Sequence, residues 1–192
     1  LDGLLARRLG SASPFGAELD SLCDFVDFGV APGLLVYKMA LTDARDFGWA
    51  LVLVYIVCCC LRLARFNVGT KASLGEAAEK TSFVGVPAPA GAMLALLPVF
   101  LTVDGMVDAA DYPLAVALWL GIVGLLMVSR LPTFSPKALR IPRDRVRWLL
   151  VGTAIVVGLG LTHFWLTMII AVFAYIASLA HSAIVTRLGR RA

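Results

Sequence analysis

The sequence has few residues of the kinds that hold zinc or iron. It contains two histidines and four cysteines among 192 residues, and the cysteines are Cys23 and the run 58–60. No Cys-x-x-Cys pair and no Cys/His ligand spacing is present. Consecutive cysteines in an apolar helix point in different directions, so we interpret them as small packing residues. A thiolate metal site or a cysteine redox centre is therefore not expected.

Charged side chains are also scarce. They make up 16% of the residues, whereas hydrophobic residues make up 60% and the mean hydropathy is +0.88. A soluble domain of this length does not need so much apolar surface, and several runs approach the roughly 20 apolar residues that cross a bilayer. Internal repeats and a second soluble domain are absent. The sequence therefore predicts an all-α fold, a polytopic transmembrane helical bundle.

Six membrane spans are predicted from the apolar runs. They cover residues 19–39, 47–66, 83–103, 113–131, 148–162 and 164–185. Polar loops are expected at 1–18 and 67–82. The last two spans are joined tightly at His163 and are predicted to form a hairpin.

The basic residues are unevenly divided between the loops. Fifteen of the 17 Lys and Arg residues fall in alternate loops or near the chain ends, and only Lys38 and Arg45 lie on the opposite side. Positive charge marks the cytoplasmic side of a membrane protein. We therefore expect a multi-pass protein of the cell (inner) membrane, with the N-terminal loop facing the cytoplasm. Because the charge follows one membrane face, it does not indicate a nucleic-acid partner.

The first span opens with stacked carboxylates. Asp20 and Asp24 are four residues apart, so a helix places them on one face, which Asp27 continues. A lone Asp at a helix start is commonly a cap. Several carboxylates at the mouth of a membrane helix, however, are costly unless a cation neutralises them. A divalent metal suits this role, since Mg²⁺ and Mn²⁺ bind carboxylate oxygens and complete their shells with substrate phosphates.

The spacing of these residues resembles the signature of the CDP-alcohol phosphotransferase family. That signature is Asp-x2-Asp-Gly-x2-Ala-Arg-x8-Gly-x3-Asp-x3-Asp. Every element from the second Asp onward is present, as Asp2, Gly3, Ala6, Arg7, Gly16, Asp20 and Asp24. The first Asp would fall two residues before Leu1. We therefore expect this chain to be a fragment whose upstream helices are missing.

Three further segments resemble the phosphatidylserine synthase branch of that family. They are residues 15–24 continued by 28–32, residues 61–67 followed by 83–90, and residues 129–137. The Arg-Phe-Asn sequence at 65–67 and the Pro-Ala-Pro sequence at 87–89 point to serine as the acceptor. The resemblance predicts an N-terminally truncated catalytic region over residues 1–137. A basic loop and a C-terminal transmembrane hairpin are expected over residues 138–192.

The resemblance implies a membrane transferase that moves a phosphatidyl group from CDP-diacylglycerol to L-serine and releases CMP. It implies two divalent ions, Mg²⁺ or Mn²⁺, held by Asp2, Asp20 and the upstream Asp. Asp24 would border the second ion and act as general base on the serine hydroxyl. Family members are typically homodimers, so a homodimer in the lipid bilayer is expected.

The remaining candidate residues would bind substrate. Small residues would leave room for the cytidine diphosphate, and basic or amide side chains would receive phosphate or the serine carboxylate. This set comprises Gly3, Ala6, Arg7, Gly16, Arg62, Arg65, Asn67 and Lys137. Arg62 and Arg65 are equally compatible with basic anchors at the membrane interface. Lys137 is also compatible with a positively flanked helix end.

Two alternatives remain open. The acceptor could instead be glycerol 3-phosphate, inositol phosphate or choline, since the basic loop at 140–147 would suit a phosphorylated acceptor. An ion-coupled transporter could use Asp20, Asp24 and Asp27 as a cation path. Transporters usually place such residues near mid-bilayer on broken helices and show repeats. Here the carboxylates lie at a helix mouth and no repeat is visible.

Overall fold

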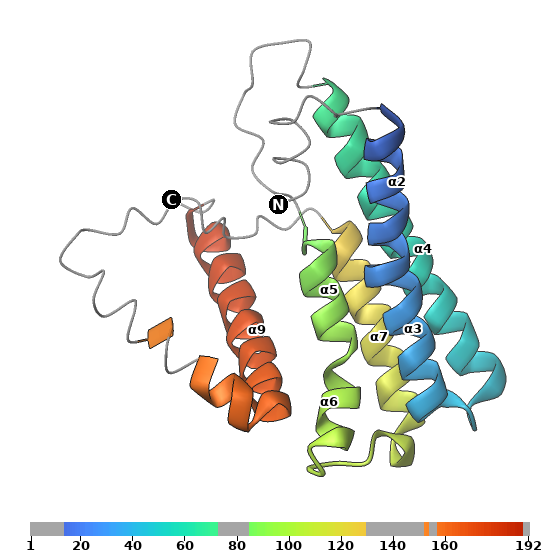
Figure 1. Cartoon of the computed structure of the whole chain (residues 1–192), viewed down its shortest axis with the longest axis vertical. Helices are drawn as coiled ribbons and strands as arrows, with labels where there is room; N and C mark the ends of the chain where they lie inside the picture. The colour runs from blue at the N-terminus through green and yellow to red at the C-terminus, as the bar shows by residue number, and fades with distance from the viewer. Residues whose placement is uncertain (1–13, 73–84, 130–151, 154–156, 190–192) are drawn as a thin grey trace.

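The computed structural model describes residues 14–72, 85–129, 152–153 and 157–189, and Figure 1 shows their arrangement. Every element in these ranges is a helix, and no strand occurs within them. The predicted all-α class is therefore confirmed for the described residues. The helices run up and down beside one another (Figure 1).

A continuous helical run extends from Pro14 to Leu41. It consists of α2 (Pro14–Phe25), the wide π turn η1 (Val26–Val30), α3 (Ala31–Val36) and a second π turn, η2 (Tyr37–Leu41). Pro32 accounts for the first irregularity. It has no N–H for the Phe28 carbonyl four residues earlier, and its ring crowds that carbonyl in an α-helix. The run begins five residues before the predicted span, so part of the expected N-terminal loop is helical.

The next helix, α4 (Arg45–Ala72), returns antiparallel to this run and packs closely against it. A Cβ atom added to Gly29 would lie 3.2 Å from Cβ of Cys59, and one added to Gly33 would lie 3.3 Å from Cγ1 of Ile56. Small residues four apart allow two helices to approach closely in a lipid environment. The prediction of a loop over residues 67–82 is wrong for residues 67–72, because α4 remains helical to Ala72.

The third predicted span is two helices, α5 (Ala88–Ala95) and α6 (Leu97–Val103). The break falls at Leu96, just before Pro98 in the first turn of α6. A 3₁₀ turn, η3 (Ala109–Asp111), then leads into α7 (Pro113–Val128). The helix α7 packs along α4, where a Cβ atom on Gly124 would lie 3.2 Å from the Cα atom of Tyr55.

The last helix, α9 (Phe164–Gly189), lies against α5 and α6. The rings of Trp165 and Phe100 meet there, with centroids 5.9 Å apart. Residues 157–162 are helical and end at His163, where the predicted hairpin turn falls. The segments 148–151 and 154–156 of the predicted fifth span lie outside the described residues.

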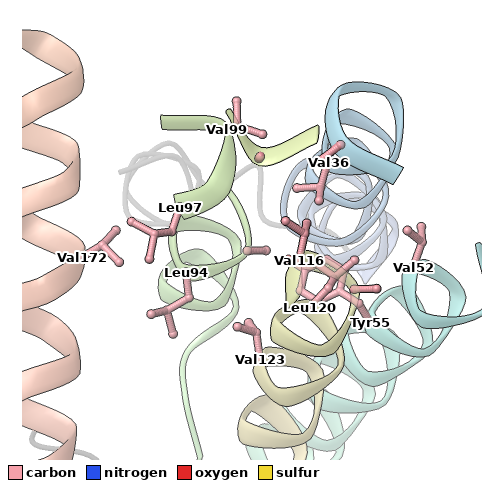
Figure 2. Close-up of a cluster of buried hydrophobic side chains, with 14 of the residues drawn as sticks. Val36, Val52, Tyr55, Leu94, Leu97, Val99, Val116, Leu120, Val123 and Val172 are labelled. Carbon is pink, nitrogen blue, oxygen red and sulfur yellow. The ribbon is translucent and has the colours of Figure 1, made fainter. Parts of the chain in front are cut away.

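The core lies where these helices meet. Figure 2 shows Val36, Val52, Tyr55 and Leu120 gathered between α3, α4 and α7, with Val172 of α9 directed toward Leu97. All six are nearly or fully buried. The core therefore joins segments that are far apart in the sequence.

Within the part of the chain that the structure describes, two helices are long and apolar enough to cross a membrane, by length and composition. They are Phe47–Val68 and Phe164–Ser182, and Pro113–Val128 is a shorter apolar helix. Only 28% and 11% of the most apolar stretches of the two long helices are buried inside the protein. A helix that is apolar on all sides but mostly exposed is suited to lipid.

Candidate functional site

One end of the bundle collects the site residues that the structure describes. At this end α2 begins, α4 ends, α5 begins and α7 ends (Figure 1). The carboxylates of α2 therefore lie at the same end as the polar residues in the last turns of α4. The sequence predicted the same grouping, because its alternate basic loops put the start of the first span and the end of the second span on one side of the membrane.

The carboxylates centre on Asp24. Its side chain is partly buried and lies within electrostatic range of Asp20 and Asp27, which are both exposed. Asp20 and Asp24 occupy adjacent turns of α2, whereas Asp27 lies in the wide turn η1. Their like charges repel one another, so this face is suited to binding cations.

The described residues do not by themselves form a metal site. Within the ranges given above, no group of three or more His, Cys, Asp or Glu side chains is placed to hold a metal ion. Asp20 and Asp24 offer carboxylate oxygens, which are the ligand type that Mg²⁺ and Mn²⁺ prefer. The donor chemistry therefore fits a divalent metal. The remaining predicted N-terminal and loop residues lie outside the described residues, namely Asp2, Gly3, Ala6, Arg7 and Lys137. Gly16 is described and lies exposed on α2.

Asn67 is joined directly to the carboxylate-bearing helix. Its side-chain amide donates a hydrogen bond to Oγ of Ser21 over 2.9 Å. Ser21 follows Asp20 in the chain, so this bond brings the end of α4 to the carboxylate face. The sequence predicted Asn67 as a site residue, but its contact with Ser21 was not predicted.

Arg62 and Arg65 have different surroundings. Arg62 is partly buried, and its Nη1 donates to the Met127 carbonyl near the end of α7 over 3.4 Å. Basic side chains commonly interact with the free carbonyls of a helix C-terminus. Arg65 is exposed at the end where the carboxylates lie. Arg62 therefore braces α4 against α7, whereas Arg65 is accessible.

Two aromatic donors were missed by sequence reasoning. Oη of Tyr55 donates to the Phe28 carbonyl over 2.6 Å, and Nε1 of Trp119 donates to the Leu94 carbonyl over 2.8 Å. Each carbonyl lies four residues before a proline, Pro32 or Pro98, which has no N–H to offer it. The two prolines could have predicted that these carbonyls lack a donor from their own helix. The residues around each proline, however, do not indicate which side chain from another helix supplies the hydrogen bond.

Tyr175 is a third aromatic residue that the sequence did not single out. Its buried hydroxyl has no hydrogen-bond partner among the described residues. It lies within electrostatic range of Arg62. With residues of α5 and α9 it lines an apolar cavity of about 180 Å³, whose other lining residues are Ala90, Met93, Leu94, Ala171 and Val172.

Comparisons with known proteins identify a family and several relatives of this chain. The sequence model of the family described as CDP-alcohol phosphatidyltransferase matches residues 1–128, which include the carboxylate face and the end of α4. A Mycobacterium bovis protein named CDP-diacylglycerol–serine O-phosphatidyltransferase is 35% identical over 178 residues, covering 91% of this chain and 61% of that protein. A Helicobacter pylori protein of the same name is 36% identical, covering 70% of this chain and 56% of that protein.

A third relative carries the same name. The protein of that name from Methanocaldococcus jannaschii is 37% identical over 131 residues, covering 67% of this chain and 54% of its own length. The chain thus spans a little over half of the length of the relatives it matches.

Proposed function

Because this chain belongs to the CDP-alcohol phosphatidyltransferase family, we propose that its protein transfers a phosphatidyl group from CDP-diacylglycerol to L-serine and releases CMP. The names of its relatives support serine as the acceptor. The observation that carries the proposal is the hydrogen bond between Asn67 and Ser21. It joins the Arg-Phe-Asn segment, which pointed to serine, to the helix that carries the carboxylates.

The proposed reaction is an in-line displacement at phosphorus. The serine hydroxyl oxygen forms a bond to the phosphorus of the phosphatidyl group, and the bond from that phosphorus to the CMP oxygen breaks. CMP leaves with the electron pair of that bond. Asp24 takes the proton of the serine hydroxyl, a role that suits its central, partly buried position.

The other residues bind and orient the two substrates. Asp2 and Asp20, with the upstream Asp of the family signature, would hold two divalent ions, Mg²⁺ or Mn²⁺, and Asp24 would border the second ion. These ions would neutralise phosphate charge when bound. The exposed Arg65 receives the serine carboxylate or the lipid phosphate. Arg62 supports that end of α4 through the Met127 carbonyl. The same chemistry with another acceptor alcohol remains the alternative.

We propose that the protein lies in the inner membrane, with its carboxylate end facing the cytoplasm. Support comes from the two membrane-capable helices and from large apolar side chains exposed on the bundle, such as Leu22, Leu125 and Ile170. Exposed apolar surface of this extent suits lipid. The concentration of basic residues in alternate loops of the sequence supports the orientation. A homodimer is proposed from the family resemblance, and chemical cross-linking in membranes tests it.

The test is release of CMP by the full-length protein in detergent with CDP-diacylglycerol. Serine, glycerol 3-phosphate, inositol phosphate and choline are offered in turn, with Mn²⁺, with Mg²⁺ and after chelation by EDTA. We expect metal-dependent CMP release with serine alone. Release with a different acceptor would contradict serine but preserve the family chemistry. No release from folded protein would favour the transporter alternative.

Asp24→Asn tests the general base. Loss of the proton acceptor is expected to lower turnover by about 10²–10⁴-fold or more, while the unfolding temperature stays close to that of the wild type. Asp104→Asn is the matched control, because Asp104 carries an exposed carboxylate and lies at the C-terminal end of α6, at the opposite end of the bundle. An active Asp24→Asn enzyme would remove the base assignment.

A further inference from the structure

Tyr55 and the carboxylate face are connected through one backbone carbonyl. The sequence positions Asp20, Asp24, Phe28 and Pro32 are spaced by four, so they follow one another down successive turns of the same helical run. Pro32 removes the N–H that an α-helix would direct at the Phe28 carbonyl. The hydroxyl of Tyr55 supplies the missing donor from α4, at 2.6 Å.

The wide turn η1 lies between Asp24 and α3. It spans Val26–Val30 and therefore contains Phe28. Its Val26 carbonyl accepts from the N–H of Ala31, five residues later, rather than from a residue four later. Such π turns are frequent at functional sites, because they change where the neighbouring side chains point. The Phe28 carbonyl thus lies inside the turn that sets the direction of Asp24 relative to the rest of the helix.

Tyr55 is held rigidly at this position. Its side chain is 0% exposed in the core between α3, α4 and α7 (Figure 2). Its Cα atom lies against Gly124 of α7, where an added Cβ would be only 3.2 Å away. One turn further along α4, Cys59 lies against Gly29 of the same wide turn. The donor is therefore fixed by α7 behind it and by close helix packing beside it.

We propose that Tyr55 is a positioning residue for the metal-binding carboxylates, acting through its hydrogen bond to the Phe28 carbonyl. This inference rests on the proposed function, because it concerns the metal that Asp20 and Asp24 would bind. Loss of the hydroxyl leaves the Phe28 carbonyl without this donor inside the protein. The wide turn then shifts, and Asp24 moves away from the geometry in which it faces the metal with Asp20.

The chain offers a matched control for this hydrogen bond. Trp119 donates to the Leu94 carbonyl, which Pro98 frees in the same way, but that bond joins α7 to α5. Trp119→Phe therefore removes a bond of the same kind from a helix that carries no carboxylate of the site. Tyr55→Phe and Trp119→Phe should lower the unfolding temperature similarly, and they should differ in metal binding.

The experiment is a titration of each full-length variant with Mn²⁺, in which paramagnetic resonance measures the free ion. Tyr55→Phe is expected to weaken Mn²⁺ binding about tenfold or more, as is typical when support behind a metal ligand is lost. Trp119→Phe should bind Mn²⁺ as the wild type does. In the CMP assay, Tyr55→Phe should require more Mn²⁺ for half-maximal rate, while the KM for serine at saturating Mn²⁺ changes little.

Each outcome decides the proposal. Equal loss of Mn²⁺ affinity in both variants, or no loss in either, overturns it, as does a wild-type protein that binds no Mn²⁺. A wild type that binds Mn²⁺ without releasing CMP contradicts the proposed function, and Tyr55 is then still tested by the titration. If Tyr55→Phe does not fold, Pro32→Ala is the second variant, because it restores an N–H opposite Phe28. A folded Pro32→Ala protein with wild-type Mn²⁺ affinity then overturns the proposal.

Discussion

Gly85→Ala adds a single methyl group, yet it should lower the stability of this protein strongly. Gly85 precedes α5, at the end of the bundle where the carboxylates lie. Its φ is +85°, a conformation that costs a residue with a side chain about 1–2 kcal/mol. An added Cβ would also lie 2.6 Å from the Ser129 carbonyl oxygen and 2.8 Å from that of Met127. These are backbone atoms at the end of α7, so they cannot rotate away.

The structure supplies a control that separates the two costs. Gly105 also has a positive φ, +79°, but an added Cβ there would meet nothing within 4 Å. Gly105→Ala should therefore show only the backbone cost. Gly85→Ala should add about 1–3 kcal/mol for overpacking. In a chain of this size, that difference corresponds to an unfolding temperature about 2–12 °C lower than that of Gly105→Ala.

The assay is thermal unfolding in detergent, followed by fluorescence of the four tryptophans at one fixed scan rate. Because Nη1 of Arg62 lies 3.2 Å from the added Cβ, Gly85→Ala should also lower CMP release at temperatures where it is folded. An unfolding temperature for Gly85→Ala equal to or above that of Gly105→Ala would refute the reasoning. It would mean that the end of α7 can move away from Gly85 at little cost.

Three further substitutions test individual side chains. Asn67→Ala and Ser21→Ala each remove the hydrogen bond between α4 and α2, so each should lower stability by about 1 kcal/mol in thermal unfolding. Only Asn67→Ala should also raise the KM for serine, and an equal rise in both variants would exclude direct contact of Asn67 with serine. Tyr175→Phe removes a buried hydroxyl that has no hydrogen-bond partner in the described ranges, so it should stabilise the protein by up to about 1 kcal/mol. A lower unfolding temperature for Tyr175→Phe would show that this hydroxyl is bonded in the protein.

Much of the helical pattern was predictable from the sequence. Apolar runs and polar interruptions located most helices to within a few residues, because hydropathy and chain-breaking residues act locally. The errors have local causes as well. Pro98 divides the third predicted span into α5 and α6, and the polar residues after Phe66 continue α4 as helix instead of ending it.

The candidate site was predictable in part. The spacing of Asp20 and Asp24 placed two carboxylates on adjacent turns, and the family signature assigned them to metal binding. The sequence also singled out Asn67 and Arg62. It did not show that Asn67 bonds to Ser21 or that Arg62 reaches the Met127 carbonyl. Asp2, Gly3, Ala6 and Arg7 lie outside the described residues, so their roles stay predictions.

The amino-acid sequence by itself determined the helical class, the apolar surface and the carboxylate spacing, since each depends on residues within a few turns of one another. Only the tertiary structure decided which side chains meet across helices. The hydrogen bonds from Tyr55 to Phe28, from Asn67 to Ser21 and from Arg62 to Met127 join residues 27, 46 and 65 positions apart. Those partners depend on the register of antiparallel helices, which is set by where Gly29, Gly33 and Gly124 allow close approach. A proline leaves the carbonyl four residues before it without a helical N–H donor, and this position is predictable from the sequence. Helix packing determines which side chain donates a hydrogen bond to that carbonyl.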